Sequence, residues 1–294
     1  GPALQPWTPS PYFGAEGQIL YRRWDEATGL PVADSGTAAD WAQDAADPLH
    51  GRRVLYPGWD LDAFFRPARS TETAHLTVAV GPDHLYEALR SRLEQAEQSI
   101  WIETYTFESA ALAQVLLERR AAGVEVILLL ESGPVGGVAA AQRWICGQLQ
   151  AAGAQVWFMG GGLTPARYRF QHAKFAIVDG RLALVSSENL NPTGMPADDK
   201  SNGTAGRRGV LLATDAPGVV ARLQAIFQAD LDPAHHRDLS TCAELPELCS
   251  GLPPLPEPDY VSYTVAFSRP VEIEGEMGFE VVQAPENSLR AADG

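Results

Sequence analysis

Residues 170–194 read "FQHAKFAIVDGRLALVSSENLNPTG", and this stretch decides how the rest of the chain is interpreted. Its two apolar runs, 172–179 and 182–187, predict a pair of strands that turn at Asp179-Gly180. A strand that serves packing alone needs neither two cationic side chains nor a carboxylate. The polar residues of this strand pair therefore require a chemical explanation.

The sequence on both sides of this pair alternates between strand and helix patterns. β-Branched and apolar runs predict strands, and apolar residues at helical intervals predict the helices between them. The predicted strands are 75–80, 99–107, 124–131, 154–159 and 207–214, and the predicted helices are 85–98, 111–123, 137–153 and 216–231. This order predicts an α/β fold with a layered mixed sheet flanked by helices.

The chain divides by composition into three regions. Residues 1–70 are rich in Pro, Gly, Trp and Asp and predict an irregular, aromatic-rich N-terminal extension. Residues 71–235 carry the alternating pattern, and residues 236–294 begin as a Pro-rich linker. Within that last region, 279–293 repeats the strand, Pro and helix start of 76–90, which predicts the start of a second, similar half. The first residues, Gly-Pro without Met, are typical of a chain cut by a protease.

The composition limits the partners of this protein. The 294 residues are 45% hydrophobic and 20% charged, which is ordinary for globular proteins. Lys and Arg number 22 against 37 Asp and Glu, so the net charge is 22 − 37 = −15, which disfavours nonspecific attraction to DNA or anionic lipid. A site for an anionic group such as phosphate would therefore have to be a local basic pocket. No apolar run approaches the ~20 residues of a transmembrane helix, so no transmembrane segment is expected.

The three cysteines do not suggest a metal site. Cys146 lies in a helical pattern and is expected to be a small buried hydrophobe. Cys242 and Cys249 bracket a short Pro-containing stretch and either remain thiols or form a disulfide loop. Such a disulfide would indicate an oxidising compartment and hence a secreted or periplasmic protein.

The side chains of the strand pair suit a phosphodiester. His172 and Lys174 are two residues apart and point to one face of a strand, and Ser187 and Asn189 follow in the turn. An imidazole can attack phosphorus or transfer a proton near neutral pH. An ammonium, a hydroxyl and an amide can all donate to phosphate oxygens, and the carboxylate of Asp179 can orient or balance them.

With these spacings the chain resembles the phospholipase D superfamily, whose signature is His-x-Lys, four residues, Asp, six residues, then Gly-Ser-x-Asn. Here the residues are His172, Lys174, Asp179 and the turn Ser186-Ser187-Glu188-Asn189. Every spacing matches, and Ser186 stands where Gly is usual. The order of strands and helices over 71–235 also looks like one phospholipase D-like domain.

The resemblance implies hydrolysis or transfer of a phosphodiester through a phosphohistidine, with no metal or other cofactor. It makes His172 either the nucleophile or the acid/base, and makes Lys174, Ser187 and Asn189 the phosphate-binding residues. Asp179 would support the catalytic pair His172 and Lys174. The substrate would be a phospholipid or a nucleic acid.

The active site of this family combines two such motifs, and this sequence contains one. The second motif would come from a homodimer partner or from a missing C-terminal region. A noncatalytic, phosphate-binding half is the alternative. Several relatives also carry an acidic residue on the strand after the Ser/Asn turn to orient the His, whereas Arg207 and Arg208 occupy that region here. Arg207 either binds phosphate or is merely solvated.

Two carboxylates elsewhere are further candidates. Glu103, in the predicted strand 99–107, is either a partly buried carboxylate near the site or a solvated residue at a strand end. Glu131 ends the strand 124–131, and sites in α/β folds gather at such carboxyl ends.

Overall fold

The structure is a computed structural model that describes residues 21–22, 24–25, 30–33, 41–42, 67–160, 168, 170–197, 206–233, 236, 238–254, 267 and 269–284. The chain divides into two compact units, residues 69–279 and a second unit made of 1–68 and 280–294. In the second unit the structure describes four two-residue strands. They form two antiparallel pairs, β1 (Tyr21–Arg22) with β4 (Trp41–Ala42) and β2 (Trp24–Asp25) with β3 (Leu30–Pro31). Most of the predicted N-terminal extension lies outside the described residues.

A nine-stranded mixed sheet forms the first unit, in the order β12-β8-β7-β6-β9-β10-β11-β5-β13. Its strands are β5 (Ala68–Val80), β6 (Ser99–Thr104), β7 (Glu125–Glu131), β8 (Gln155–Met159), β9 (Lys174–Val178), β10 (Leu182–Ser186), β11 (Val210–Thr214), β12 (Leu239–Thr241) and β13 (Val271–Val281). Strands β6, β7 and β8 are parallel, whereas β6 to β9, β9 to β10, β10 to β11 and β11 to β5 pair antiparallel. The predicted mixed α/β sheet is therefore confirmed.

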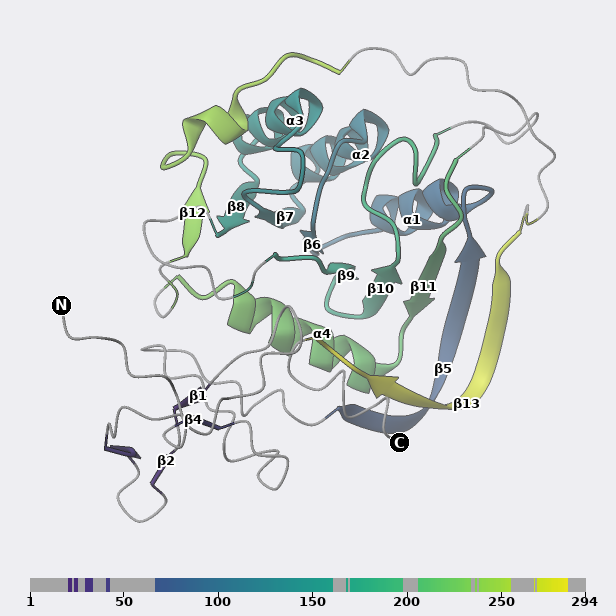
Figure 1. Cartoon of the computed structure of the whole chain (residues 1–294). Helices are drawn as coiled ribbons and strands as arrows, with labels where there is room; N and C mark the ends of the chain where they lie inside the picture. The colour runs from purple at the N-terminus through teal and green to yellow at the C-terminus, as the bar shows by residue number, and fades with distance from the viewer. Residues whose placement is uncertain are drawn as a thin grey trace. The chain divides into compact units, whose positions relative to one another are not determined.

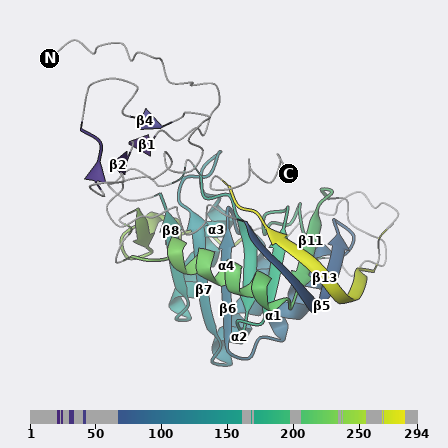
Figure 2. The same cartoon turned by 90° about the horizontal axis from the view of Figure 1, so that it is seen from below.

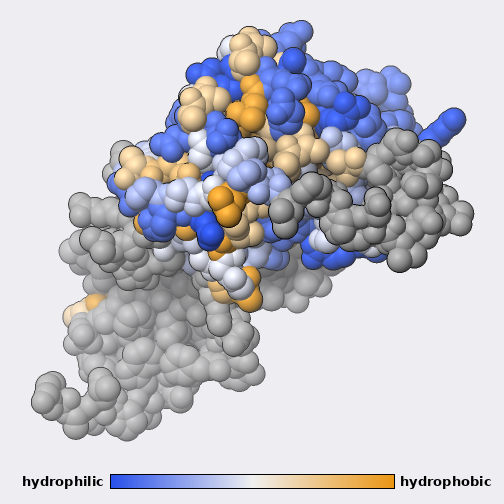
Figure 3. Space-filling view, turned by 90° about the horizontal axis from the view of Figure 1, so that it is seen from above, coloured by the Kyte–Doolittle hydropathy of each residue, from blue (hydrophilic) through white to orange (hydrophobic). Residues whose placement is uncertain are grey.

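Helices cover both faces of this sheet. Helices α1 (Leu85–Glu94), α2 (Ala110–Ala121) and α3 (Ala140–Ala151) lie on one side, and α4 (Pro217–Asp230) lies on the other (Figure 1). Seen from below, α4 runs across the strands (Figure 2). The described surface seen from above intersperses hydrophilic and hydrophobic side chains, as expected where the outer faces of helices meet solvent (Figure 3).

The alternation of side chains along the strands assigns the two faces. Ile100, Ile102 and Ala176 join the core under α1, α2 and α3. On the opposite face, the ring of Phe227 in α4 stacks on Trp101 at a centroid distance of 5.3 Å. Lys174 is two residues before Ala176 in β9, so its side chain leaves the strand on the same face, the one covered by α1, α2 and α3.

The hairpin at Asp179-Gly180 is as the sequence predicts. Strands β9 and β10 pair through Leu182 and Val178, and the N–H of Arg181 donates to the carbonyl of Val178 at 3.0 Å. Three residues, 179–181, connect the strands, and Asp179 and Gly180, the central residues of the turn that the Arg181 bond closes, have left-handed φ values of 53° and 61°. This turn fixes the register of the two strands that carry the motif.

The C-terminal region contributes the two edge strands, β12 and β13. The Cys242–Cys249 disulfide is formed, and Cys146 is buried in α3, as expected. The last strand, β13, begins at Val271, so it is longer than the strand that the sequence predicts from residue 279. The predicted helix start after residue 284 lies outside the described residues. The division of the chain at residues 70 and 235 stays a prediction.

Candidate functional site

Most of the motif gathers at one edge of the sheet, meaning the edge formed by the carboxyl ends of β6, β7 and β10 and not an outer strand. Lys174 begins β9 opposite Thr104, the last residue of β6, while the Ser-Asn turn follows the end of β10. The carbonyl of Leu190, just after the turn, accepts the N–H groups of Glu108 (2.7 Å) and Ser109 (3.0 Å) at the start of α2. The carboxyl ends of β6, β7 and β10 thus surround the residues that the sequence singled out.

His172 presents its ring at this edge. The residue is exposed, and its ring lies edge-on to the ring of Tyr105 with 4.6 Å between the centroids. Partial burial, and then the positive charge of Lys174, lower the pKa of His172 below its usual value. Within the described part of the chain, no hydrogen bond engages either ring nitrogen. The lowered pKa favours the neutral imidazole near pH 7, and the lone pair of that form is not engaged by another described residue.

Lys174 lies beside His172. Its Nζ donates to the main-chain carbonyl of His172 at 2.7 Å and lies 5.5 Å from the centroid of the Tyr105 ring. Burial lowers the pKa of Lys174 to about 8, and the negative charge of Glu188 opposes this shift. Lys174 also lines a largely apolar pocket with Leu89, Ile102, Thr104, Phe175, Ala176, Leu184, Ser186, Leu190 and Leu211.

The turn after β10 is held by its own hydroxyl groups. The Ser186 hydroxyl accepts the N–H of Glu188 at 3.0 Å. The Ser187 hydroxyl accepts the N–H of Val210 at 3.0 Å and donates to Oε1 of Glu188 at 3.4 Å. Among the described residues, the buried Oδ1 of Asn189 has no hydrogen-bond partner. The hydroxyl proton of Ser187 is thus directed at a carboxylate, and the amide N–H groups of Asn189 form no hydrogen bond in the described structure.

Ser186 fits the position where the family usually has Gly. Among the described residues, the only one besides glycine with a positive φ is Asp179. Ser186 therefore lies in ordinary extended backbone at the end of β10. No left-handed conformation calls for glycine there.

Asp179 lies at the opposite edge of the sheet from His172. One oxygen of its carboxylate accepts the N–H groups of Gln98 (2.7 Å) and Ser99 (2.9 Å), and the other accepts that of Glu97 (3.0 Å) and Nη2 of Arg181 (3.2 Å). These bonds lower its pKa although burial opposes them. Five residues of strand at ~3.3 Å each place it roughly 16 Å from Lys174. Asp179 fixes the turn between α1 and β6 and lies at the other end of β9 from Lys174.

Glu103 and Glu131 converge on Gln171, the residue before His172. Oε1 of Glu103 accepts the side-chain amide of Gln171 at 2.8 Å, and Oε2 of Glu131 accepts its main-chain N–H at 2.7 Å. Glu103 and Glu131 are buried, so the solvated interpretation of Glu103 is wrong. Burial raises the pKa of Glu131, although hydrogen bonds from the N–H groups of Gly133, Gln171 and Ser132 oppose this shift. The two carboxylates orient the segment that leads into His172.

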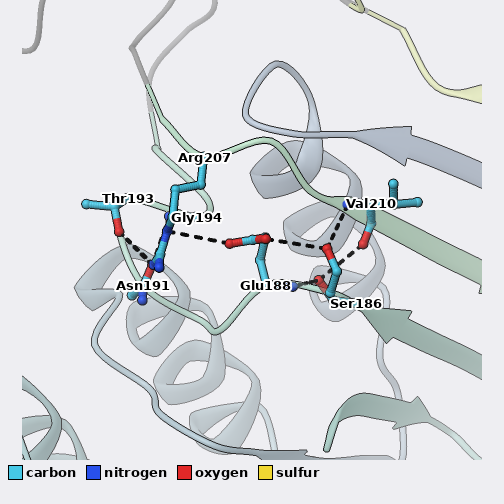
Figure 4. A network of polar contacts seen from close by, with 8 residues as sticks. Ser186, Glu188, Asn191, Thr193, Gly194, Arg207 and Val210 are labelled. Atoms are coloured by element: carbon cyan, nitrogen blue, oxygen red, sulfur yellow. Dashed lines mark hydrogen bonds and ion pairs between the residues drawn. The ribbon is translucent and has the colours of Figure 1, made fainter. Parts of the chain in front are cut away.

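Arg207 lies next to the motif turn. Its Nη2 donates to Oδ1 of Asn191 at 3.0 Å and to the hydroxyl of Thr193 at 2.9 Å, and its Nε is 3.6 Å from Oε2 of Glu188 (Figure 4). Arg208 points elsewhere, to Asp83 and to the ring of Phe267. Arg207 is thus held in place on three sides, which a merely solvated side chain would not be.

Three residues of this site were missed from the sequence, namely Tyr105, Gln171 and Glu188. Tyr105 shares its strand face with Glu103, which was the available signal. The motif includes Glu188 only as a variable position, and it begins one residue after Gln171. The described residues contain no group of three or more His, Cys, Asp or Glu side chains placed to hold a metal ion.

Comparisons with known proteins identify similar domains. The family model described as "Cardiolipin synthase, PLD-like domain" matches residues 89–231. The cardiolipin synthase of Oceanobacillus iheyensis is 28% identical over 199 residues, which cover 66% of this chain and 36% of that protein. Cardiolipin synthase A of Salmonella arizonae is 31% identical over 150 residues, which cover 48% of this chain and 29% of that protein. The chain spans about a third of the length of these relatives.

Two solved structures are similar to part of this chain. The phospholipase D family member Nuc from Salmonella typhimurium has a TM-score of 0.43 and 18% identity, covering 58% of this chain and 97% of that one. The phosphatidylserine synthase of Haemophilus influenzae has a TM-score of 0.42 and 15% identity, covering 60% and 41%. The family model covers the whole motif from His172 to Asn189 together with strands β6 to β11, so residues 89–231 form a phospholipase D-like domain.

Proposed function

We propose that this chain supplies one half of an active site that hydrolyses or transfers a phosphodiester through a phosphohistidine. The observation that carries the proposal is the pairing of a neutral, accessible His172 with the ammonium of Lys174 at one sheet edge. Superfamily members act on phosphodiesters, and the comparisons support that chemistry at the level of the family.

In this proposal His172 is the nucleophile. A nucleophile must be unprotonated and a general acid must carry a proton, and the lowered pKa of His172 favours the first role. A ring nitrogen forms a bond to phosphorus as the bond from phosphorus to the leaving oxygen breaks. The leaving alkoxide takes a proton from a second His, which then removes a proton from water or an alcohol. That oxygen displaces the imidazole and completes hydrolysis or transfer.

Lys174 and Asn189 hold the phosphate in this reaction. The ammonium stabilises negative charge on the nonbridging oxygens, and the amide N–H groups of Asn189 donate to the same oxygens. The Ser187 hydroxyl joins them only if it turns away from Glu188. Glu103 and Glu131 act indirectly through Gln171, and Asp179 supports the fold of the motif strand.

The second His belongs to another motif-bearing half. Phospholipase D-like domains pair two such halves, and this sequence contains one His-x-Lys. A homodimer partner or a C-terminal region beyond this sequence would provide the second. Among the described residues, no helix is long and apolar enough to cross a membrane.

An apolar rim beside His172 favours a phospholipid over a nucleic acid. Phe170 is 38% exposed and lies 6.2 Å from the ring of Tyr105, and Val135 is 80% exposed. The N–H of Val135 donates to the Tyr105 hydroxyl at 2.6 Å, so the loop after β7 is tied to the same aromatic ring. Acyl chains reward apolar contact, whereas a nucleic acid groove would require clustered cations. The names of the curated relatives point the same way.

Hydrolysis of bis(p-nitrophenyl) phosphate in EDTA, with wild type beside His172→Ala and the solution mass measured, tests the proposal. Metal-independent turnover that is lost in the variant is the expected result. Turnover that survives in His172→Ala would overturn the assignment of the nucleophile. Absence of turnover from a folded monomer would favour the noncatalytic, phosphate-binding half.

A further inference from the structure

The carboxylate of Glu188 lies within the motif turn. The side chain is 13% exposed. Oε1 accepts the hydroxyl of Ser187 at 3.4 Å, and Oε2 faces Nε of Arg207 at 3.6 Å (Figure 4). A carboxylate this close to a phosphate site would repel the substrate unless neighbouring cations balance its charge. The partners of Glu188 are therefore informative.

Two glycines make room for this carboxylate. A Cβ at Gly209, just before β11, would overlap Cγ of Glu188 and lie 2.7 Å from its Oε1. A Cβ at Gly194 would lie 3.0 Å from Oε2. Both distances are shorter than ordinary contacts, so a side chain at either position would displace the carboxylate. Glu188 is therefore packed into a defined place and is not a solvated surface charge.

Arg207 is the first cation that Glu188 contacts. Besides its bonds to Asn191 and Thr193, the main-chain N–H of Arg207 donates to the carbonyl of Thr193 at 2.8 Å. The side chain remains 55% exposed. Its guanidinium is thus fixed by neutral acceptors and one carboxylate while it stays open to a ligand, as a preorganised anion-binding group would be.

Lys174 is the other cation of the motif. The negative charge of Glu188 favours its protonated form and opposes the effect of burial. The other titratable groups beside Lys174 are His172 and Tyr105. The remaining pocket residues, from α1, β6, β10 and β11, carry no charge. Glu188 is therefore the anionic side chain that acts on Lys174.

We propose that Glu188 is a positioning residue, a packed carboxylate in the motif turn that pairs with Arg207 and balances the charge of Lys174, so that both cations serve one phosphodiester group. This rests on the proposed function for its substrate. The three groups together carry one net positive charge, which matches the single negative charge of a phosphodiester. Arg207 then contacts the substrate and Glu188 acts through the two cations.

The lysine content of the chain makes this testable by NMR. Lys174 and Lys200 are the only lysines in the sequence, so ¹³Cε-lysine labelling of the full chain gives two side-chain signals, assigned with Lys174→Arg. The wild-type Lys174 signal is expected to titrate near pH 8. In Glu188→Gln, which keeps the size of the side chain over Gly209, the midpoint is expected to fall by roughly 0.5–1 pH unit because the opposing charge is lost.

Glu188→Asp retains the charge but withdraws it by one methylene, so its midpoint is expected between those of the wild type and Glu188→Gln. The Lys200 signal serves as a reference in the same sample. A Lys174 midpoint unchanged or raised in both variants, while each remains folded by circular dichroism, would overturn the proposal. A purely structural role for Glu188 would change the melting temperature without moving this midpoint.

The part played by Arg207 is tested by titrating dimethyl phosphate against the Lys174 signal at pH 7. Arg207→Gln is expected to weaken binding about fivefold or more, since a charge-assisted contact is lost. Arg181→Gln, at the opposite sheet edge, is the matched control and is expected to bind as the wild type does. Equal affinity in Arg207→Gln would remove Arg207 from the proposal.

These readouts are independent of turnover. If the midpoint shifts in Glu188→Gln but the wild type hydrolyses no diester, the proposed function fails while the positioning role stands. If turnover depends on His172 but the midpoint does not shift, the positioning role fails alone.

Discussion

Replacing Asp179 by Asn is expected to destabilise the fold and leave the chemistry intact. Asn tolerates the left-handed φ of 53° at this position, so the hairpin turn is preserved. Its carbonyl can keep the bonds to Gln98 and Ser99, but an NH₂ group then faces the N–H of Glu97 and the guanidinium of Arg181. The loss of a charge-assisted bond to a main-chain N–H costs about 2–3 kcal/mol.

Urea denaturation followed by circular dichroism measures this effect. A loss of that size corresponds to a melting temperature lower by about 5–10 °C for a domain of this size. Arg181→Gln is the matched control, since it removes only the exposed partner and is expected to cost within about 0.5 kcal/mol. The folded Asp179→Asn variant should keep the turnover of the wild type because His172 lies at the other edge of the sheet.

The effect of Asp179 also has a defined pH dependence. Its pKa is lowered in the folded state, so its contribution to stability is complete above the unfolded value of ~3.9 and is lost as pH falls through the folded value. The difference in the free energy of unfolding between wild type and variant should therefore be constant near pH 7 and should shrink below about pH 4. An Asp179→Asn variant as stable as wild type, or one that folds but loses turnover, would refute this reasoning.

The remaining predictions concern the edge that carries His172. The rate of diester cleavage should rise with pH through the lowered pKa of His172, since the nucleophile must lose its proton, and should fall above about 8 as Lys174 loses its charge; a pH-rate profile with a flat alkaline limb would contradict this. Val135→Ser and Phe170→Ser should reduce turnover of phosphatidylglycerol vesicles several-fold and leave turnover of bis(p-nitrophenyl) phosphate unchanged; equal losses on both substrates would argue against the apolar rim. Gln171→Ala should cost about 1–3 kcal/mol in stability and lower kcat more than it raises KM, as measured by denaturation and steady-state kinetics, because the segment before His172 loses its bond to Glu103; unchanged kcat would exclude a positioning role.

The part of the site that is local in sequence could be predicted. A strand period of two places His172 and Lys174 on one face, and Asp-Gly marks the hairpin that sets their register. Both depend on neighbours within about ten residues, so composition and spacing suffice.

The contacts between distant segments could not be predicted. Glu131 reaches Gln171 across 40 residues because β9 inserts beside β6, and an apolar pattern does not encode that strand order. Strand β5, next to the edge strand β13, starts at Ala68 although its first residues are polar, since its exposed positions alternate with covered ones. The contacts of Asp179 could not be predicted for the same reason, because its partners Glu97 to Ser99 lie on another segment.

The measurement that tests the central claim most directly is the intact mass of the protein quenched during reaction with bis(p-nitrophenyl) phosphate. The p-nitrophenolate departs without a proton near neutral pH, so His172 can form its bond to phosphorus even where no second His is present. One p-nitrophenyl phosphoryl adduct per chain, mapped to the peptide that contains His172 and absent in His172→Gln, is the predicted result. A folded wild type that forms no adduct, or an adduct that persists in His172→Gln, would contradict the assignment of His172 as the nucleophile.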